Sequence, residues 1–272
     1  MKEQAQLQKF FYDGAWIDAS EFDTVYRPLQ PSCYEVIRMI DGKPLFLHAH
    51  YERFLGTVNS VDQPIPFTEE ELREKLCQLA DANGVRNYNA KLIYNDFDNG
   101  GHVYLFLTHT SYPSEEMYRD GVKTDFLQVE RENPHAKIIN ASLRDQADAL
   151  MKAEGLFEAV LLDRDGNVTE GSKSNIFFIK DGCLCTSPAD GVLLGVTRTH
   201  IIDTAQRAGI PFRELTIPRA EVGSYSAAFI SGTSPKVLPI AVMGEFTFDV
   251  NEPTLRRMMV LYDEAIREDI GE

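Results

Sequence analysis

One carboxylate, Glu170, stands in the polar stretch N-V-T-E-G-S-K-S-N at residues 167–175, just before an apolar run at residues 176–179. A carboxylate beside a buried strand is normally paired with a cation or protonated, because an unpaired buried charge is strongly unfavourable. The partner of Glu170 is therefore either a cationic side chain, with Lys173 as the nearest lysine, or a group that does not belong to the protein.

A lysine, Lys137, stands in the short strand-like segment N-P-H-A-K-I-I-N at residues 133–140. A lysine flanked by an alanine and two isoleucines is unusual on an ordinary solvated surface. It is either a charged edge-strand residue that discourages edge-to-edge pairing or a desolvated amine that can form an imine.

Two loops offer groups that bind anions. In L-L-G-V-T-R, residues 193–198, a glycine turn leads directly into a predicted helix at Val196 and Thr197. The free amides and the dipole of a helix N-terminus bind anions. The loop S-G-T-S-P at residues 231–235 follows an apolar strand and contains Thr233 and Ser234. Each loop is either an anion site or an ordinary turn.

Other common kinds of site are disfavoured by the motifs. His48 and His50 are two residues apart, but no carboxylate or cysteine cluster accompanies them, so we expect a structural or surface pair and no metal site. Neither a G-x-x-x-x-G-K-[ST] loop nor a G-x-G-x-x-G loop occurs.

Composition limits the class of protein further. The 272 residues are 43% hydrophobic and 25% charged, with a formal net charge of -15. Such an acidic chain disfavours nucleic acid and anionic membranes as partners. No apolar run approaches the roughly 18–20 residues of a membrane span, and the first residues lack the apolar stretch of a secretory signal. The four cysteines form no zinc or disulfide pattern, so we expect reduced thiols in a cytoplasmic protein.

The predicted elements indicate an α+β fold. Helical periodicity with capping signals covers residues 68–84, 142–154 and 197–208, and a last helix follows Pro253. Asp-Gly turns between apolar runs predict three β-hairpins, at Asp41-Gly42, Asp165-Gly166 and Asp181-Gly182. Repeated hairpins with interspersed helices predict mainly antiparallel sheets. We expect an N-terminal α/β domain at residues 1–112, a linker at 113–121 and a C-terminal domain at 122–272.

In their order along the chain, these pieces resemble the fold-type IV family of pyridoxal-5'-phosphate (PLP) enzymes. That family includes branched-chain amino acid aminotransferases, D-amino acid aminotransferases and 4-amino-4-deoxychorismate lyases. The matching segments are C-Y-E-V-I-R-M-I-D-G-K-P-L-F-L-H-A-H-Y-E-R-F at 33–54, K-I-I-N at 137–140, E-A-V-L-L-D-R-D-G-N-V-T-E-G-S-K-S-N-I-F at 158–177, L-L-G-V-T-R at 193–198 and F-I-S-G-T-S-P-K-V-L-P at 229–239. The resemblance implies the two-domain fold of D-amino acid aminotransferases, with PLP bound by the C-terminal domain at 122–272.

The resemblance also implies roles for two of the residues above. Lys137 would hold PLP as a Schiff base and move a proton during the reaction. Glu170 would face the pyridine nitrogen, so that the cation paired with this carboxylate would be a pyridinium.

Four further residues would bind the phosphate of the cofactor in this interpretation. Arg53 would supply a guanidinium, the amides of Val196 and Thr197 would supply the helix N-terminus, and Thr233 would supply a hydroxyl.

Recognition of the substrate carboxylate departs from the family pattern. Tyr34 and Tyr88 match active-site tyrosines of the family, although either is equally well explained as a core aromatic. The arginines that bind the substrate carboxylate in the two best-known classes are replaced by Ala90 and by the stretch that begins at Asn95. The amides around Ser234 are an alternative carboxylate site.

The activity that the resemblance implies is PLP-dependent transamination between an amino acid and a 2-oxo acid, in a homodimer. One alternative is a pyruvate-releasing 4-amino-4-deoxychorismate lyase on the same fold. The other is a non-catalytic ligand-binding homologue, against which the joint presence of Lys137, Glu170 and Arg53 argues.

Overall fold

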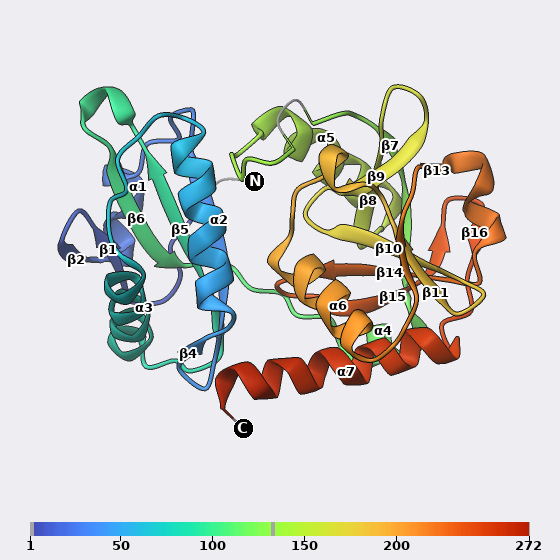
Figure 1. Ribbon diagram of the computed structural model, residues 1–272. Helices are drawn as coiled ribbons and strands as arrows, with labels where there is room; N and C mark the ends of the chain where they lie inside the picture. Colours follow the sequence, from blue (N-terminus) through green and yellow to red (C-terminus); the bar gives the residue numbers. More distant parts are fainter. Residues whose placement is uncertain (1–2, 132–133, 272) are drawn as a thin grey trace. The chain divides into compact units, whose positions relative to one another are not determined.

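The computed structural model describes residues 3–131 and 134–271, and the chain divides into two compact units (Figure 1). Unit 1 comprises the described residues of Tyr112–His135 and Asn140–Arg267, and unit 2 those of Lys2–Ser111, Ala136–Ile139 and Glu268–Glu272. The stretch 113–121, expected as a linker, carries helix α4 and belongs to unit 1. The segment 136–139 belongs to unit 2, although its neighbours in sequence belong to unit 1.

The sheet of unit 2 is antiparallel throughout, in the order β2-β1-β6-β5-β3-β4. Its strands are β1 (Lys9–Tyr12), β2 (Ala15–Asp18), β3 (Cys33–Ile40), β4 (Lys43–Pro44), β5 (Tyr88–Asn95) and β6 (His102–Leu107). The helical segments are η1 (Ala19–Glu21), α1 (Phe22–Val25), α2 (Leu47–Asn59), α3 (Glu69–Asn83) and η2 (Phe97–Asn99).

Local sequence explains how α2 and α3 begin. The capping box predicted for α3 is present, since Thr68 accepts from the Glu71 amide and Glu71 accepts from the Thr68 amide. The strand after Asp41-Gly42, β4, has only two residues. Phe46 adopts a left-handed conformation (φ 50°) and its amide donates to Asp269 at 2.7 Å, which turns the chain from β4 into α2.

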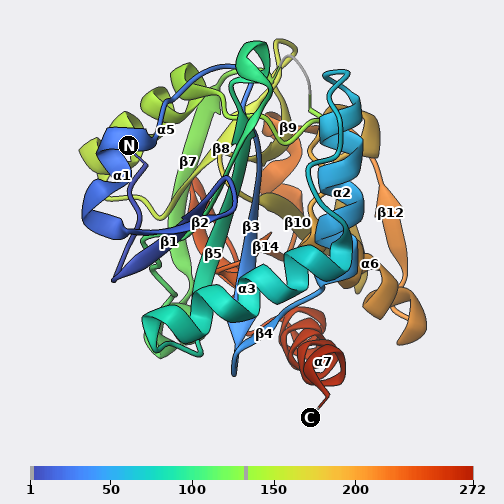
Figure 2. The same cartoon turned by 90° about the vertical axis from the view of Figure 1, so that its left-hand side faces the viewer.

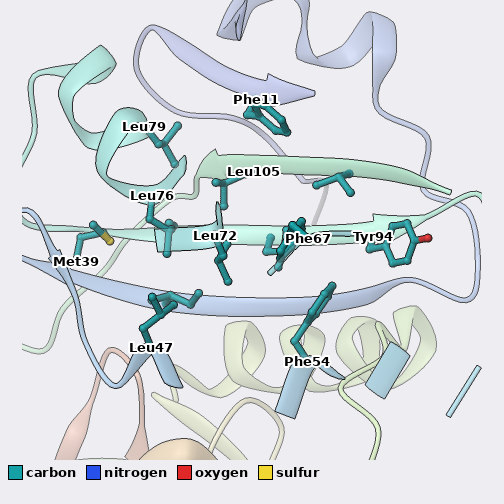
Figure 3. Close-up of a cluster of buried hydrophobic side chains, with 14 of the residues drawn as sticks. Phe11, Met39, Leu47, Phe54, Phe67, Leu72, Leu76, Leu79, Tyr94 and Leu105 are labelled. Carbon is teal, nitrogen blue, oxygen red and sulfur yellow. The ribbon is translucent and has the colours of Figure 1, made fainter. Parts of the chain in front are cut away.

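The two faces of this sheet pack against different partners, because side chains alternate along each strand. Helices α2 and α3 lie on one face (Figure 2) and enclose a cluster of buried side chains (Figure 3). We call this face the helix face; β3 and β5 contribute Ile37, Met39, Ala90 and Leu92 to it. The opposite face, the aromatic face, packs Ile93, Tyr104 and Phe106 against Phe10, Phe22 and Tyr26.

Unit 1 contains a ten-stranded sheet in the order β12-β11-β10-β14-β15-β7-β8-β9-β13, with β16 paired to β15. The pairs β7–β8, β7–β15 and β11–β12 are parallel, and the other pairs are antiparallel. The predicted α+β fold with mainly antiparallel sheets is therefore confirmed. The strands are β7 (Val122–Gln128), β8 (Glu158–Leu162), β9 (Asn167–Gly171), β10 (Asn175–Lys180), β11 (Cys183–Thr186), β12 (Phe212–Glu214), β13 (Ile217–Pro218), β14 (Ala227–Gly232), β15 (Lys236–Met243) and β16 (Phe246–Thr247).

The helices of unit 1 are α4 (Glu115–Asp120), α5 (Ala141–Glu154), η3 (Ala189–Gly191), α6 (Val196–Arg207) and η4 (Arg219–Ser224), and α7 (Pro253–Ile270) extends from unit 1 to the last residues of unit 2. Three of them, α5, α6 and α7, lie where the sequence predicts them, whereas α4, η3 and η4 were not predicted. Asn140 caps α5 by accepting from the Leu143 amide at 3.0 Å, and Gly155 ends it in a left-handed conformation. In the described part of the chain, the helices are all too short or too polar to cross a bilayer.

The packing of α3 on the helix face predicts a large loss of stability when a central side chain is shortened. We expect Leu76→Ala to lower the free energy of unfolding by about 2–5 kcal/mol, because Leu76 is 0% exposed and its removal leaves a cavity. The matched change Leu29→Ala, at a leucine that is 42% exposed, should alter it by less than about 0.5 kcal/mol. Urea unfolding of the two variants measures both values, and equal losses would contradict this packing.

Candidate active site

Lys137 is held by backbone pairing with the first residues of β3. Ile138 forms a β-bridge with Cys33, and the Tyr34 amide donates to the Lys137 carbonyl at 3.1 Å. The Lys137 amide donates to Thr57 Oγ1 on α2 at 3.2 Å. Within the described part of the expected strand-like segment, residues 134–140, only Ile138 pairs as in a strand, through this single β-bridge. The backbone of Lys137 is nevertheless held on two sides, by β3 and by α2.

The ring of Tyr34 lies close to two ammonium groups. Lys137 Nζ is 4.7 Å from the ring centroid, and Lys91 Nζ is 5.0 Å from the same centroid. Both distances are within the range of cation–π attraction. The structure therefore places Tyr34, one of the two expected substrate-side tyrosines, beside the expected catalytic lysine.

The other tyrosine, Tyr88, lies elsewhere. It is paired with Met39 in the sheet and packs against the cluster on the helix face. Tyr34 points to the aromatic face, where it packs against the opposite cluster. Tyr88 is therefore a core aromatic in this unit, and the structure does not bring it together with Tyr34.

Arg53, the expected phosphate ligand, is anchored by a buried carboxylate. Arg53 Nε donates to Glu35 Oε1 at 2.7 Å, and Nη2 donates to Glu35 Oε2 at 2.6 Å. His50 Nδ1 lies 2.8 Å from Glu35 Oε2. Glu35 is on β3 and points to the helix face, where His50 and Arg53 are three residues apart on α2. The bidentate pair fixes the plane of the Arg53 guanidinium.

The charges of this group are set by burial and by one another. Burial raises the pKa of Glu35, but the adjacent Arg53 guanidinium and the hydrogen bonds from Arg53 and His50 outweigh it and lower the pKa to about 2. Burial is the main cause that lowers the pKa of His50, and the positive charges of Arg53 and Lys137 act in the same direction. His50 is therefore neutral at pH 7 and donates from Nδ1 to an ionised Glu35.

His48 has a separate environment on the exposed side of α2. Its Nδ1 lies 2.8 Å from Glu69 Oε2, and this hydrogen bond raises the pKa of His48. The two histidines differ in burial because a spacing of two places them on different sides of a helix. No cluster of potential metal ligands forms among residues 3–131 and 134–271.

In unit 1, the buried carboxylate Glu170 has a cationic partner that the sequence did not suggest. Arg131 Nε donates to Glu170 Oε1 at 2.7 Å, and the Leu193 amide donates to Glu170 Oε2 at 3.0 Å. Lys173, the nearest lysine in sequence, instead pairs with Asp148 at 2.6 Å. Glu170 is 2% exposed, so the pairing with Arg131 favours its ionised form inside the protein.

The N-terminus of α6 has the features expected of an anion site. Gly195 is the N-cap residue and offers no side-chain cap, and Val196 and Thr197 at the helix start are buried. A Cβ on Gly195 would lie 2.2 Å from Asn175 Oδ1, so glycine is required for this close approach. The amides of this helix start are therefore not capped by a side chain of the N-cap residue.

The loop between β14 and β15 starts beside this helix terminus. Ser231 is the sheet partner of Asn175, and its hydroxyl is buried without a hydrogen-bond partner in the part of the chain that the structure describes. Thr233 and Ser234 follow in the turn and are partly exposed. A buried hydroxyl that has no partner among the described residues is suited to bind a polar ligand.

Several charged residues near these groups were not identified from the sequence. Arg131 is 39 residues from Glu170, so no local pattern connects them. The sequence did contain a signal for the burial of Glu35, because this residue occupies a buried-face position of the alternating strand C-Y-E-V-I-R-M-I. Glu158 also accepts hydrogen bonds from the hydroxyls of Ser172 and Ser174, at 2.6 and 2.8 Å.

Comparisons with known proteins define the class to which this fold and these residues belong. The family profile described as "Amino-transferase class IV" matches residues 32–243. A D-alanine aminotransferase of Listeria monocytogenes serotype 1/2a (strain 10403S) is 30% identical over 221 residues, which are 76% of each chain. The chain therefore belongs to the class IV aminotransferases, a family of PLP-dependent enzymes.

Two solved structures are similar in fold. A branched-chain aminotransferase from the archaeon Thermoproteus uzoniensis, solved with norvaline, has a TM-score of 0.82 at 24% identity, covering 98% of this chain and 96% of that one. A putative 4-amino-4-deoxychorismate lyase from Legionella pneumophila has a TM-score of 0.77 at 20% identity, covering 86% and 91%. These two likenesses establish the fold.

The opposite shifts of the two histidine pKa values predict opposite pH effects. A lowered folded pKa makes stability fall as pH decreases through the unfolded value of 6.5, whereas a raised one makes stability fall as pH increases through the folded value. We expect His50→Gln to reduce the loss of stability that accompanies a decrease from about pH 7.5 to about pH 5.5. The matched variant His48→Gln should steepen that loss slightly. Urea unfolding at both pH values tests this, and a steeper loss in His50→Gln would contradict it.

Proposed function

We propose that this protein transfers an amino group between an amino acid and a 2-oxo acid, with PLP as cofactor and Lys137 as the catalytic lysine. The observation that carries this proposal is the position of Lys137 in a member of the class IV family. Its backbone is fixed by β3 and α2, and its ammonium lies 4.7 Å from the ring of Tyr34.

The residues that we assign to the cofactor phosphate suit a dianion. Arg53 provides a guanidinium whose orientation is fixed by Glu35. Val196 and Thr197 provide helix N-terminal amides beside a glycine that admits no side chain. We assign Thr233 and Ser234 to the same group, and the unsatisfied hydroxyl of Ser231 supports a ligand in this region.

Glu170 is assigned to the pyridine nitrogen of the cofactor. When bound, the cofactor supplies a ring that withdraws electrons from the substrate α-carbon, and it does so best with a protonated nitrogen. The ion pair with Arg131 and the Leu193 amide hold Glu170 in the ionised form that favours this proton. Arg131 thereby acts on the reaction through Glu170.

Lys137 is assigned two tasks. Its amine would bind the cofactor aldehyde in the absence of substrate. Once released, Nζ would accept the proton from the substrate α-carbon and return it during the reverse half-reaction. The fixed backbone of Lys137 limits the movement of Nζ to that of its own side chain, which supports its use in proton transfer.

The relatives leave one rival activity on this fold. The aminodeoxychorismate lyase likeness is one of fold, at 20% identity, whereas the relative at 30% identity is a D-alanine aminotransferase. A transaminase needs an amino donor and a 2-oxo acid acceptor, whereas a pyruvate-releasing lyase needs one substrate. Pyruvate release from aminodeoxychorismate without an acceptor would therefore favour the lyase.

We infer in addition that the protein is a cytoplasmic homodimer. The four cysteines are free thiols, which suits a reducing compartment, and burial raises the pKa of Cys33 to about 12, so that it stays protonated at neutral pH. Analytical ultracentrifugation of the purified protein tests the dimer directly.

Replacing Lys137 tests the central assignment. We expect Lys137→Ala to lower kcat for transamination at least about 100-fold, because the proton-transfer group is lost. When an amino donor is added to the wild-type protein, the visible absorbance of its cofactor should change. A 2-oxo acid added afterwards should reverse this change. The amino donors to be tested are L- and D-alanine, L- and D-glutamate and L-leucine.

A matched control and a direct chemical readout accompany this experiment. Lys173→Ala removes an exposed ion pair with Asp148 and should leave kcat within about twofold. Borohydride reduction followed by peptide mass spectrometry should locate the cofactor on Lys137. Undiminished turnover in Lys137→Ala would show that the assignment is wrong.

Replacing Glu170 tests its role apart from cofactor binding. We expect Glu170→Gln to lower kcat about 100-fold while the cofactor stays bound, because the neutral amide cannot favour a protonated ring nitrogen. Glu158→Gln, at another buried carboxylate of unit 1, should lower stability more than kcat. Absorbance titration with the cofactor and steady-state kinetics separate the two effects, and equal kcat values for both variants would contradict the role of Glu170.

A further inference from the structure

Lys91 lies in the interior of a sheet, where lysine is rare. It is 4% exposed and stands on β5, which is paired on both sides, with β3 and with β6. Lysine side chains are almost never buried to this extent without a specific partner. The chain as a whole is acidic, with a formal net charge of -15, so a buried cation here is a local feature that requires an explanation.

The alternation of β5 places this cation on the same face of the sheet as Tyr34. Ala90 and Leu92 pack into the cluster under α2 and α3, so Lys91 between them points to the aromatic face. Its partners across the sheet are Val36 on β3 and Phe106 on β6. Lys91 is thus a basic side chain on a face made largely of aromatic residues.

The distance between Lys91 and the proposed catalytic lysine has an upper limit that admits a small substrate. Lys91 Nζ and Lys137 Nζ lie 5.0 and 4.7 Å from the same Tyr34 ring centroid, so the two ammonium groups are within about 10 Å of each other. An amino acid with its α-carbon against one amine and its carboxylate bound by another spans roughly 8 Å between the two nitrogens. A 2-oxo acid has the same span.

A carboxylate already lies at Lys91. Glu3, near the start of the chain, forms an ion pair with the Lys91 ammonium. The side chains of Lys91 and Glu3 are 5% and 13% exposed, so the pair is largely removed from water. The Glu3 carboxylate therefore shows that the surroundings of Lys91 accept this chemical group.

Building on the proposed function, we propose that Lys91 binds the carboxylate of the amino-acid and 2-oxo-acid substrates, and that the Glu3 carboxylate occupies this position until a substrate displaces it. Lys91 then binds the substrate carboxylate in place of an arginine, which the sequence lacks at positions 90 and 95. Glu3 acts as an intramolecular competitor, which weakens the binding of small carboxylates to the free enzyme.

A purely structural ion pair gives different expectations. If Lys91 and Glu3 only fasten the first residues to the sheet, losing either partner has the same consequence, because each loss leaves one buried charge uncompensated. If they compete with substrate, the two losses change substrate binding in opposite directions. The sign of the change in KM therefore separates the two interpretations.

The experiment compares Lys91→Met, Lys91→Arg and Glu3→Gln in the holoenzyme with the preferred amino acid of the wild-type protein. We expect KM to increase about 30-fold in Lys91→Met, to be largely restored in Lys91→Arg, and to decrease about fivefold in Glu3→Gln. The control is Lys75→Met, because the Lys75 ammonium also lies against an aromatic ring, that of Phe11 at 4.9 Å. We expect its KM to stay within about twofold of wild type.

Inhibition by propionate and by its uncharged isostere propionamide gives a readout that does not depend on turnover of the variant's own substrate. A cationic subsite makes propionate the stronger inhibitor of the wild-type enzyme, and this preference should disappear in Lys91→Met. An unchanged preference in that variant, or a KM that increases in Glu3→Gln as it does in Lys91→Met, would overturn the proposal.

The same measurements separate this inference from the proposed function. If no amino donor changes the cofactor absorbance of the wild-type protein, the proposed transamination fails. If the wild-type protein transaminates and Lys91→Met keeps its KM, the carboxylate subsite fails alone. Should Lys91→Met not fold, Glu3→Gln still separates the two roles, because its KM decreases if Glu3 competes with the substrate and does not decrease if the ion pair is only structural.

Discussion

The two-residue period of β3 determines where the charged groups of unit 2 lie. Consecutive side chains of a strand point to opposite faces of the sheet, so Tyr34 and Glu35 serve different surroundings although they are neighbours. Glu35 points to the helix face and fixes Arg53, while Tyr34 points to the aromatic face and contacts the ammonium of Lys137. The first residues of β3 also bind the backbone of the Lys137 segment. A shift of register by one residue would exchange the two faces and separate all of these groups.

Three buried carboxylates, one in unit 2 and two in unit 1, each have a donor suited to their task. Glu35 accepts two hydrogen bonds from one guanidinium, which orients Arg53 more than a single contact would. Glu170 has a cation on one oxygen and a backbone amide on the other, so it stays charged in a buried position. Glu158 accepts from hydroxyls and amides, which shape a loop without adding positive charge. The protein therefore places guanidinium groups where we propose that a charge must be kept or a phosphate bound.

Much of the fold could be predicted from the sequence because its signals are local. The capping box at Thr68 and Glu71 and the Asp-Gly turns act within a few residues, and they are present as expected. The strand-like segment expected around Lys137 is reduced to one isolated β-bridge at Ile138 in residues 134–140. The partner of Glu170 could not be predicted, because Arg131 is distant in sequence and reaches it only through the folded sheet. The pairing of Glu35 with Arg53 could not be predicted either, because it depends on the packing of α2 on β3.

The position of Lys91, the cation that we propose for the substrate carboxylate, illustrates how a structure changes the interpretation of a sequence pattern. Spacing from Tyr88 directs attention to Ala90 as the place where an arginine is missing. In the folded unit, position 90 lies under α2 and α3 in the cluster on the helix face, and a cation there would face away from Tyr34. One residue further along β5, Lys91 lies on the face that Tyr34 shares with Lys137. Because side chains alternate, a one-residue difference decides whether a positive charge is available to a substrate carboxylate or would be buried in a hydrophobic core. The lack of arginine at position 90 is therefore compatible with carboxylate recognition, since the face that matters already carries a cation.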